Sequence, residues 1–333
     1  PLETAAGRIE RREGLLVRIE DDHGRVGLGE ATPLPGWTES LDACERALEG
    51  AAMEVDDAGR EPAFASLEGA PAARHGLSLA LADLDAEREE EPLYRRLGGD
   101  ERVDTVPVNA TVGDGDVEAT VSAATEAVGA GFDCLKVKVG ARSVETDVDR
   151  LAAVRDAVGP GVTLRADANG AWERGEAQAA LDAFGDVGVE YVEQPLAPED
   201  LDGHAALVGG PVGVALDESL ATVDPERVVE AGAANVLVLK PMALGGVDRA
   251  RSVGDTALRA GLRCVVTTMV DAVVARTAAV HLAASLPDRQ PAGLATADWL
   301  AEDLGADPAP VTSGNIAVPQ DPGLGVDVEE WPA

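Results

Sequence analysis

The sequence is short of basic residues and almost without lysine. Its 333 residues contain 27 Lys plus Arg against 61 Asp plus Glu, which gives a net charge of −34 at neutral pH. Nucleic acids and anionic membranes attract proteins through a net basic surface, so this balance excludes a protein that binds either of them by charge attraction. The apolar fraction of 45% is high enough for a packed core and excludes an acidic disordered chain.

This shortage of positive charge has two explanations. The chain is either an ordinary acidic enzyme or one adapted to a cytoplasm near molar salt, and we favour the second. At about 1 M salt the screening length falls to about 3 Å, which removes most of the self-repulsion of such a chain. We therefore expect a halophilic protein that loses structure in low salt.

Cysteine is scarce as well. The three cysteines are an odd number, lie far apart in the chain and form no CxxC motif; they are Cys44, Cys134 and Cys264. This pattern excludes a disulfide framework and a zinc site and predicts small buried apolar residues. No apolar run approaches the roughly 18 residues that a membrane span requires. We expect a cytoplasmic protein without a nucleic-acid or membrane partner, and the sequence leaves the formation of a homo-oligomer open.

The sequence also lacks a glycine-rich fingerprint of dinucleotide binding. Its four histidines fall in turns and helical patterns, so we assign them no chemistry.

What is present divides into two patterns. Residues 14–20 and 25–30 alternate as a β-hairpin, and helical patterns follow from about 40 to 57 and from about 72 to 88. The segment 1–100 is therefore predicted to be a small α+β domain. From Val103 onward, short β-branched runs alternate with Ala-rich amphipathic stretches. The runs are 105–111, 134–139, 162–167, 189–193, 212–217, 235–240 and 263–268, with a weaker eighth near 292–296.

Seven or eight consecutive βα units favour a closed α/β barrel over an open sheet. We predict that residues 101–300 form this barrel and carry the active site. The segment 301–333 is predicted to return to the first domain.

The active site of such a barrel lies at the carboxyl ends of its strands. Three consecutive predicted strands end in a carboxylate, and the strands on either side of them end in lysine. The residues at these ends are Lys136 and Lys138, Asp167 with Asn169, Glu193 with Gln194, Asp217 with Glu218, and Lys240. A single carboxylate at such a place usually caps a helix, but three in succession would repel one another without a cation. Oxygen ligands without His or Cys indicate Mg²⁺, with Mn²⁺ as a substitute.

The three lysines of the chain all fall at these strand ends, while the other 24 basic residues are arginine. Arginine stays protonated, whereas a lysine near a metal and a second cation can lose its proton and act as a base. A metal ion with facing lysines can remove a proton next to a substrate carboxylate. A small-molecule carboxylate is therefore the expected substrate.

These motifs resemble those of the muconate-lactonizing-enzyme subgroup of the enolase superfamily. The resemblance rests on Lys136-Val-Lys138, Asp167-Ala-Asn169-Gly-Ala-Trp172, Glu190-Tyr-Val-Glu-Gln-Pro195, Asp217-Glu-Ser219, Lys240-Pro-Met-Ala-Leu-Gly-Gly246 and the stretch from Gly29 to Trp37. It implies an N-terminal α+β capping domain followed by a modified TIM-type (β/α)7β barrel.

Within the subgroup, several segments are most similar to the o-succinylbenzoate synthase family of menaquinone biosynthesis. These are residues 12–17, 34–40, 240–246 and 293–299. The resemblance implies a lyase that dehydrates 2-succinyl-6-hydroxy-2,4-cyclohexadiene-1-carboxylate to o-succinylbenzoate. Relatives with the same lysines are isomerases that epimerise dipeptides, racemise N-acylamino acids or cycloisomerise muconates, and these remain alternatives.

The resemblance also implies roles for single residues. Lys138 would be the general base, and Lys240 would stabilise the enediolate from the opposite face. Lys136 would pair with the substrate carboxylate and help to depress the pKa of its neighbour. Asp167, Glu193 and Asp217 would be the metal ligands. The side chains that orient them would be Asn169, which is also a candidate substrate contact, Gln194 and Glu218.

Other candidate substrate contacts lie nearby. Arg165 precedes the first ligand on the same strand face, and a barrel-interior ion pair is its alternative role. Thr267, Thr268 and Thr296 stand at late strand ends, where a helix cap is the alternative for each. The segment from about Thr4 to Arg12 is expected to close over the mouth of the barrel.

Overall fold

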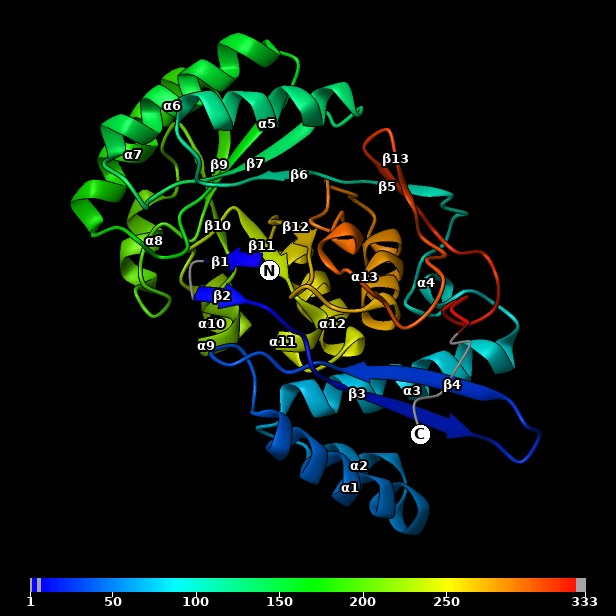
Figure 1. Cartoon of the computed structure of the whole chain (residues 1–333). Coiled ribbons are helices and arrows are strands. Elements are labelled where there is room, and N and C mark those ends of the chain that lie inside the picture. Colours follow the sequence, from blue (N-terminus) through cyan, green and yellow to red (C-terminus); the bar gives the residue numbers. More distant parts are fainter. Residues whose placement is uncertain (1, 5–6, 328–333) are drawn as a thin grey trace.

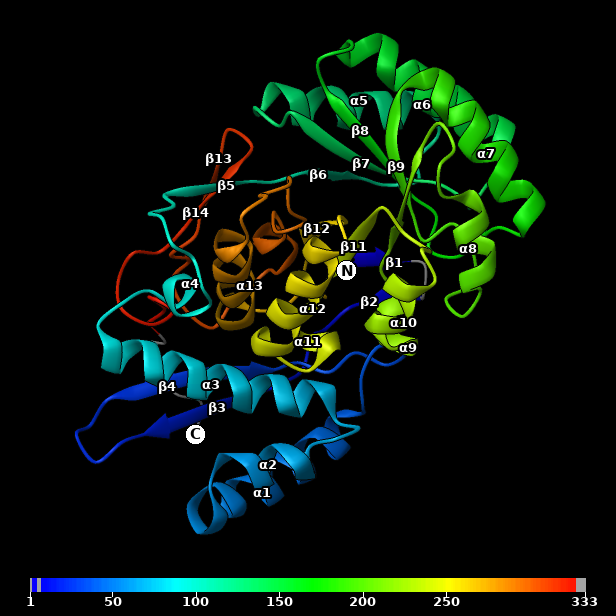
Figure 2. The same cartoon turned by 180° about the vertical axis from the view of Figure 1, so that it is seen from behind.

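The structure is a computed structural model and describes residues 2–4 and 7–327 (Figure 1). A parallel barrel wrapped by helices makes up most of the molecule, and the N-terminal domain lies against one side of it (Figures 1 and 2). The capping-domain and barrel architecture expected from the sequence is confirmed.

Seven parallel strands form the barrel in chain order from β6 to β12. They are β6 (Ala110–Val112), β7 (Cys134–Lys138), β8 (Thr163–Asp167), β9 (Val189–Glu193), β10 (Gly213–Leu216), β11 (Val236–Leu239) and β12 (Arg263–Val266). Single parallel bridges join Thr267 to Gly293 and Val108 to Ala292. The segment around residue 292 therefore lies between the last and the first strand and takes the eighth position of the ring.

The predicted first run, 105–111, is not one strand but two. Residues Thr105–Pro107 form β5, which pairs antiparallel with β14, and only β6 belongs to the barrel. Between them, Asn109 is buried and its N–H donates to the carbonyl of Ala292. The β-branched pattern marks extended backbone but does not distinguish its two pairing partners.

Helices cover the outside of the barrel and bury a continuous apolar core against the strands. Several begin at polar caps; Asp116 and Ser143, for example, accept hydrogen bonds from the N–H groups of Ala119 and Thr146. The helices are α5 (Val117–Gly129), α6 (Val144–Val158), α7 (Arg174–Val187), α8 (Leu201–Leu207), α9 (Ser219–Thr222), α10 (Pro225–Glu230), α11 (Pro241–Leu244), α12 (Val247–Arg259), α13 (Val273–Ser285) and the 3₁₀ turn Ala297–Trp299.

The N-terminal domain is a hairpin packed on helices. As predicted, β3 (Leu15–Glu20) and β4 (Val26–Ala31) pair antiparallel along their whole length. The hairpin lies on α3, and glycines at positions 27, 29 and 76 allow a close backbone approach. The remaining elements are β1 (Leu2–Thr4), β2 (Gly7–Ile9), α1 (Leu41–Ala58), α2 (Arg60–Ser66), α3 (Pro71–Glu89) and α4 (Leu93–Arg96).

The C-terminal segment first runs beside the barrel and then reaches α3. Strands β13 (Val311–Thr312) and β14 (Asn315–Ala317) form a small sheet with β5. Beyond them, the N–H of Leu324 donates to Asp83 of α3 at 2.7 Å, and the N–H of Leu93 donates to the carbonyl of Gly323. The segment thus contacts both the barrel and the N-terminal domain.

The three cysteines are free and buried, as predicted. Burial raises the pKa of each thiol, to about 11 for Cys134 and to about 12 for Cys44 and Cys264. These side chains are therefore uncharged and pack as small apolar groups.

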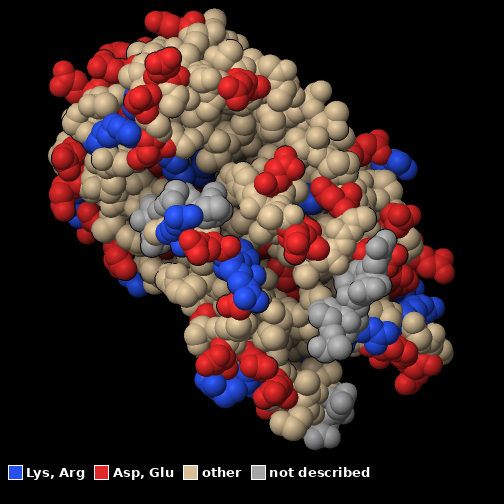
Figure 3. Space-filling model, viewed as in Figure 1, with Lys and Arg blue, Asp and Glu red and all other residues tan. Residues whose placement is uncertain are grey.

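On the face shown in Figure 3, acidic side chains are spread out, and many of the fewer basic ones lie beside them. None of the helices that the structure describes is both long and apolar enough to cross a membrane.

Candidate active site at the barrel mouth

The charged strand ends predicted from the sequence lie side by side at one end of the barrel. Lys138 pairs in register with Asp167, and Asp167 pairs with Glu193 on the next strand. Asp217 and Lys240 follow directly after β10 and β11. Five successive strands thus bring a Lys–Asp–Glu–Asp–Lys series to the same mouth, because parallel strands end at the same edge.

Lys136 and Lys138 project from the same face of β7 toward the carboxylates of the next strands. The ammonium group of Lys136 donates to Glu193 at 2.8 Å and lies 3.0 Å from Asp167. That of Lys138 donates to Asp167 at 2.6 Å and to the side-chain oxygen of Asn169 at 2.8 Å. The two lysines are thus held against the carboxylates of β8 and β9.

Lys240 occupies the opposite side of the series. Its ammonium group donates to Asp217 at 2.6 Å and lies 3.5 Å from the centre of the Trp37 ring. Trp37 belongs to the N-terminal domain, so this domain reaches the mouth. The ring face carries partial negative charge and stabilises a nearby cation.

These contacts shift the pKa values of the buried groups in different directions. Burial opposes the charge of Lys136, but the carboxylates of Asp167 and Glu193 outweigh it and raise its pKa well above the usual value. In return, Lys136 and Lys138 hold the pKa of Asp167 well below its usual range, although burial acts the other way.

Two carboxyl groups of the mouth are destabilised in their charged forms. Burial and the neighbouring Asp167 raise the pKa of Glu193. Burial, together with Glu218 and Glu193, raises the pKa of Asp217 although Lys240 opposes this. Crowded carboxylates with raised pKa values are typical of sites that a cation completes.

The side chains around the carboxylates fix the loops that carry them. Gln194 is fully buried, and its side-chain oxygen accepts from the N–H groups of Asp217 and Ser219 at 3.1 Å each. The Asn169 side chain donates to Glu218 at 2.8 Å. Both Gln194 and Asn169 have left-handed backbone, with φ of 42° and 45°, a conformation that often occurs at functional sites.

The donor set fits a hard divalent cation, although no ready-made cage is present. Among residues 2–4 and 7–327, no three His, Cys, Asp or Glu side chains lie together closely enough to hold a metal ion. Lysine ammonium groups contact the mouth carboxylates instead. One oxygen of Asp217 and one of Glu218 are nevertheless buried without a hydrogen-bond partner. Unpartnered buried carboxylate oxygens are costly unless a ligand satisfies them, and oxygen is the ligand that Mg²⁺ prefers.

Arg165 does not line the mouth. Its side chain is 1% exposed, donates to Glu190 at 2.8 Å and to the carbonyl of Pro291, and stacks over the Tyr191 ring. The alternative considered from the sequence, a barrel-interior ion pair, describes its position, and it offers no surface to a substrate.

The three threonines are placed differently from one another. The hydroxyl of Thr267 donates to the carbonyl of Gly293 at 3.0 Å and supports the closure of the barrel. Those of Thr268 and Thr296 lie 3.4 Å apart in a buried pair. Only this pair has hydroxyl groups that are not committed to a backbone carbonyl.

A group of charged residues near the mouth was missed by the sequence reasoning. Arg12 and Glu30 of the N-terminal domain lie close to Asp271, which follows β12. The two carboxylate oxygens of Glu30 accept backbone N–H groups at the start of α13, one from Ala272 and one from Ala275, each at 2.9 Å. Part of the predicted closing segment, residues 5–6, lies outside the described residues, but Arg12 at its end does contact the barrel.

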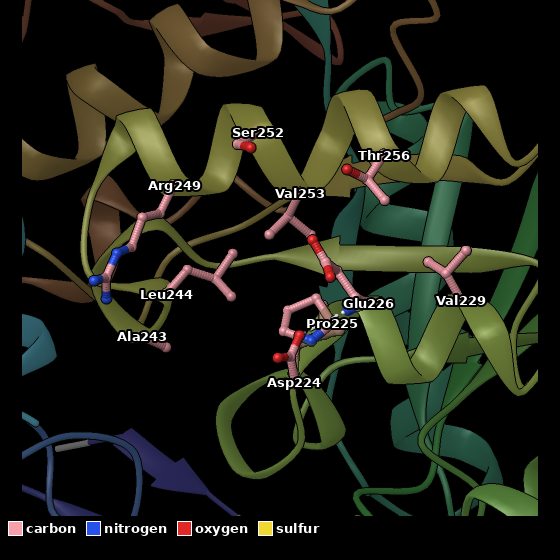
Figure 4. Close-up of a pocket in the computed structure, with 11 residues that line it drawn as sticks. Asp224, Pro225, Glu226, Val229, Ala243, Leu244, Arg249, Ser252, Val253 and Thr256 are labelled. Atoms are coloured by element: carbon pink, nitrogen blue, oxygen red, sulfur yellow. Dashed lines mark hydrogen bonds between the residues drawn. The ribbon is translucent and has the colours of Figure 1, made fainter.

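A surface hollow lies elsewhere, between α10 and α12 (Figure 4). Its lining includes Glu226 of the first helix, Asp224 at the N-cap of that helix, and Arg249 of the second. None of the residues predicted for the active site lines this hollow, so it is separate from the charged mouth.

Comparison with known proteins gives the family. Residues 119–331 match the model described as enolase C-terminal domain-like, and residues 4–84 match that of the MenC N-terminal domain. A hydrophobic dipeptide epimerase of Enterococcus faecalis is 34% identical over 93% of this chain and 88% of its own. An o-succinylbenzoate synthase of Thermosynechococcus vestitus is 33% identical over 85% of this chain and 84% of its own.

Solved structures agree with this placement. The substrate-liganded L-Ala-D/L-Glu epimerase of Bacillus subtilis superposes with a TM-score of 0.87, at 31% identity over 95% of this chain and 91% of that one. The dipeptide epimerase of E. faecalis, in complex with Mg and the dipeptide L-Leu-L-Tyr, gives a TM-score of 0.86 at 30% identity over 97% and 94%. This chain, with its capping domain, its (β/α)7β barrel and its lysine and carboxylate strand ends, belongs to the enolase superfamily.

Proposed function

We propose that the protein is a magnesium-dependent o-succinylbenzoate synthase, a lyase of menaquinone biosynthesis in the cytoplasm. This proposal rests on the different surroundings of Lys138 and Lys240. Lys138 has 32% of its side chain exposed at the mouth, whereas Lys240 has 13% and contacts both Asp217 and the Trp37 ring. A partly exposed lysine, together with a more buried one that a carboxylate and an aromatic ring hold, suits one base and one fixed positive charge.

In the proposed reaction, Lys138 takes the proton from the carbon next to the substrate carboxylate. The electron pair left behind spreads into that carboxylate as an enediolate, whose charge Lys240 stabilises from the opposite side. Lys138 then returns the proton to the departing hydroxyl group, water leaves and the ring becomes aromatic. Dehydration from one face thus needs a single acid–base group.

Asp167, Glu193 and Asp217 would hold the metal, with Asn169, Gln194 and Glu218 keeping their loops in place. A bound Mg²⁺ supplies positive charge for the substrate carboxylate and the enediolate. Lys136 remains among the three carboxylates and offsets part of their repulsion. A Mn²⁺ ion has the same preference for oxygen ligands and is expected to substitute.

An epimerase is the second candidate, because dipeptide epimerases are among the most similar relatives and solved structures. Epimerisation needs proton transfer on both faces of the substrate, and therefore a Lys240 that can act as a base. The match of the N-terminal domain to the MenC model and the similarity to an o-succinylbenzoate synthase support the lyase instead.

The experiment that separates the two candidates follows deuterium from D₂O into a panel of substrates by NMR. The panel contains the cyclohexadiene acid, L-Ala-L-Glu and its D-epimer, N-succinyl amino acids and muconate, each with the Mg²⁺-loaded protein. A lyase should dehydrate the cyclohexadiene acid with a kcat/KM at least tenfold above that for any other compound of the panel. Incorporation of deuterium into both epimers of a dipeptide without dehydration would make the protein an epimerase.

A further inference from the structure

Arg12 joins the two domains at the mouth through backbone carbonyls. Its side chain is 9% exposed. It donates to the carbonyl of Thr32 at 2.7 Å, to that of Pro33 at 3.1 Å and to that of Val270 at 3.3 Å. The first two belong to the N-terminal domain and the third to the loop after β12, so one guanidinium group holds both.

On the side of the N-terminal domain, the bound carbonyls begin the loop that carries Trp37. This loop is closed by its own hydrogen bonds: the N–H groups of Trp37 and Thr38 donate to the carbonyl of Leu34, and the N–H of Leu34 donates to the hydroxyl of Thr38. A loop tied in this way moves as a unit. Holding its start at Thr32 and Pro33 therefore determines where the Trp37 ring lies over Lys240.

On the barrel side, the bound carbonyl belongs to a strained residue. Val270 has a φ of 63°, a left-handed conformation that is unfavourable for a β-branched residue. This conformation is observed together with the contact between the Val270 carbonyl and Arg12. Two residues earlier, Thr268 contacts Thr296 at the mouth. Without Arg12, we expect Val270 to rotate out of this conformation and to move Thr268.

The charge around Arg12 explains why a cation stands there. One oxygen of Asp271 lies 4.0 Å from the guanidinium group and is buried without a hydrogen-bond partner. The Glu30 carboxylate favours the charged form of Arg12 and disfavours the charged form of Asp271. An arginine, with donors in a planar fork, can serve three carbonyls and face a carboxylate at once, whereas a lysine ammonium cannot reproduce this geometry.

We propose that Arg12 is a positioning residue that couples the capping loop 32–38 to the barrel loop 267–271 and thereby sets the substrate-contacting surface of both. It acts through Trp37 and Thr268 and not by touching the reacting atoms. The effect on catalysis rests on the proposed function, but the coupling of the two loops does not.

The test compares Arg12→Lys and Arg12→Met with Arg60→Lys as a matched control. Arg60 forms a two-bonded, partly exposed ion pair with Asp85 inside the N-terminal domain, so the control makes the same change away from the mouth. Hydrogen–deuterium exchange of the full chain is measured for peptides covering 32–38 and 267–271, together with Mg²⁺ affinity by calorimetry. Steady-state kinetics with the cyclohexadiene acid are measured on the same samples.

For both Arg12 variants, exchange should become at least fivefold faster in both segments together, while Mg²⁺ affinity stays within about threefold of the wild type. KM should rise about tenfold or more, with a smaller fall in kcat. Unchanged exchange in either segment of a folded Arg12→Lys protein, or equal effects of Arg60→Lys, would overturn the coupling. If the wild type does not dehydrate the acid, the proposed function fails, and the exchange data still decide the role of Arg12.

Discussion

At the scale of single residues, lysine is used only where its ammonium group meets the mouth carboxylates. Lys136, Lys138 and Lys240 each contact at least one of Asp167, Glu193 and Asp217, and the other 24 basic residues are arginine. An arginine would preserve the charge of such a pair but could not accept a proton. All three lysines of the chain therefore lie at the mouth, and the basic residues elsewhere are arginine.

The exchange of Lys138 for arginine tests this distinction. Because Lys138→Arg keeps the positive charge beside Asp167 and removes the base, kcat should fall by roughly 100-fold to 10,000-fold. Mg²⁺ affinity and the melting temperature should change little. Steady-state turnover and calorimetric metal titration of the same sample check both statements, and turnover within threefold of the wild type would rule out Lys138 as the base.

At the scale of elements, the strand ends could be predicted because parallel strands end at a common edge. The order of Lys138, Asp167 and Glu193 along the chain therefore becomes their order around the barrel. Alternation was less informative for residues 105–111, where one β-branched run serves two sheets. The alternating pattern also does not distinguish a substrate contact from the interior ion pair that Arg165 forms.

The contacts between the domains could not be predicted, because they join residues far apart in the chain. Arg12 and Val270 are separated by 258 positions, and Glu30 reaches Ala275 across 245. Neither pair has a local pattern that marks it. Trp37 lay inside a motif recognised from the sequence, but its position over Lys240 depends on how the capping domain packs.

The close contact between β4 and α3 requires glycine at position 29. A Cβ atom at position 29 would overlap the carbonyl oxygen of Gly76, whereas at position 50, within α1, it would meet nothing within 4 Å. Gly29→Ala should therefore destabilise the protein by several kcal/mol, on the order of a severe overpacking. Gly50→Ala should stabilise it by up to about 1 kcal/mol. Denaturant unfolding measures both, and equal stability of the two variants would contradict the close approach.

Asp83 links three elements and makes their association depend on pH. Its carboxyl group accepts N–H groups of Leu28 in β4 and Leu324 in the C-terminal segment, both at 2.7 Å. Burial raises its pKa to about 7, and Glu87 adds to the shift while the two N–H groups oppose it. Because the folded pKa exceeds the unfolded one, the stability gained from this proton is complete below about pH 4 and is lost as the pH rises through 7.

When the pH falls from 8 to 5, the wild type should therefore gain free energy of unfolding relative to Asp83→Asn. Each unit of pKa difference corresponds to about 1.4 kcal/mol. Asp182→Asn, a change at an exposed position of α7, serves as the control. Denaturant unfolding at constant salt gives the two pH profiles, and parallel profiles for wild type and Asp83→Asn would refute the linkage.

At the scale of the whole molecule, 61 acidic residues against 27 basic ones create strong self-repulsion. On the face that Figure 3 shows, acidic side chains are spread out and not gathered in one patch. Repulsion between such charges extends over about 10 Å in 0.1 M salt and over about 3 Å in 1 M salt. We therefore propose that the protein is built for a cytoplasm of high salt.

The expected result is a melting temperature that rises by 10 °C or more between dilute buffer and molar KCl, with loss of structure on dialysis into low salt. Circular dichroism along a KCl series, with sucrose at matched osmolality as the control, checks this. A melting temperature that does not depend on salt would identify an ordinary acidic enzyme.

We propose that the mouth of this barrel dehydrates a cyclohexadiene carboxylate, by removing the proton beside its carboxylate with a lysine and a metal ion. This dehydration is tested most directly by following the conversion of 2-succinyl-6-hydroxy-2,4-cyclohexadiene-1-carboxylate to o-succinylbenzoate in molar KCl. We expect rapid product formation with Mg²⁺, none above the spontaneous rate with excess EDTA, and recovery when Mg²⁺ is restored. Unchanged substrate in the presence of folded protein with bound Mg²⁺ would contradict it.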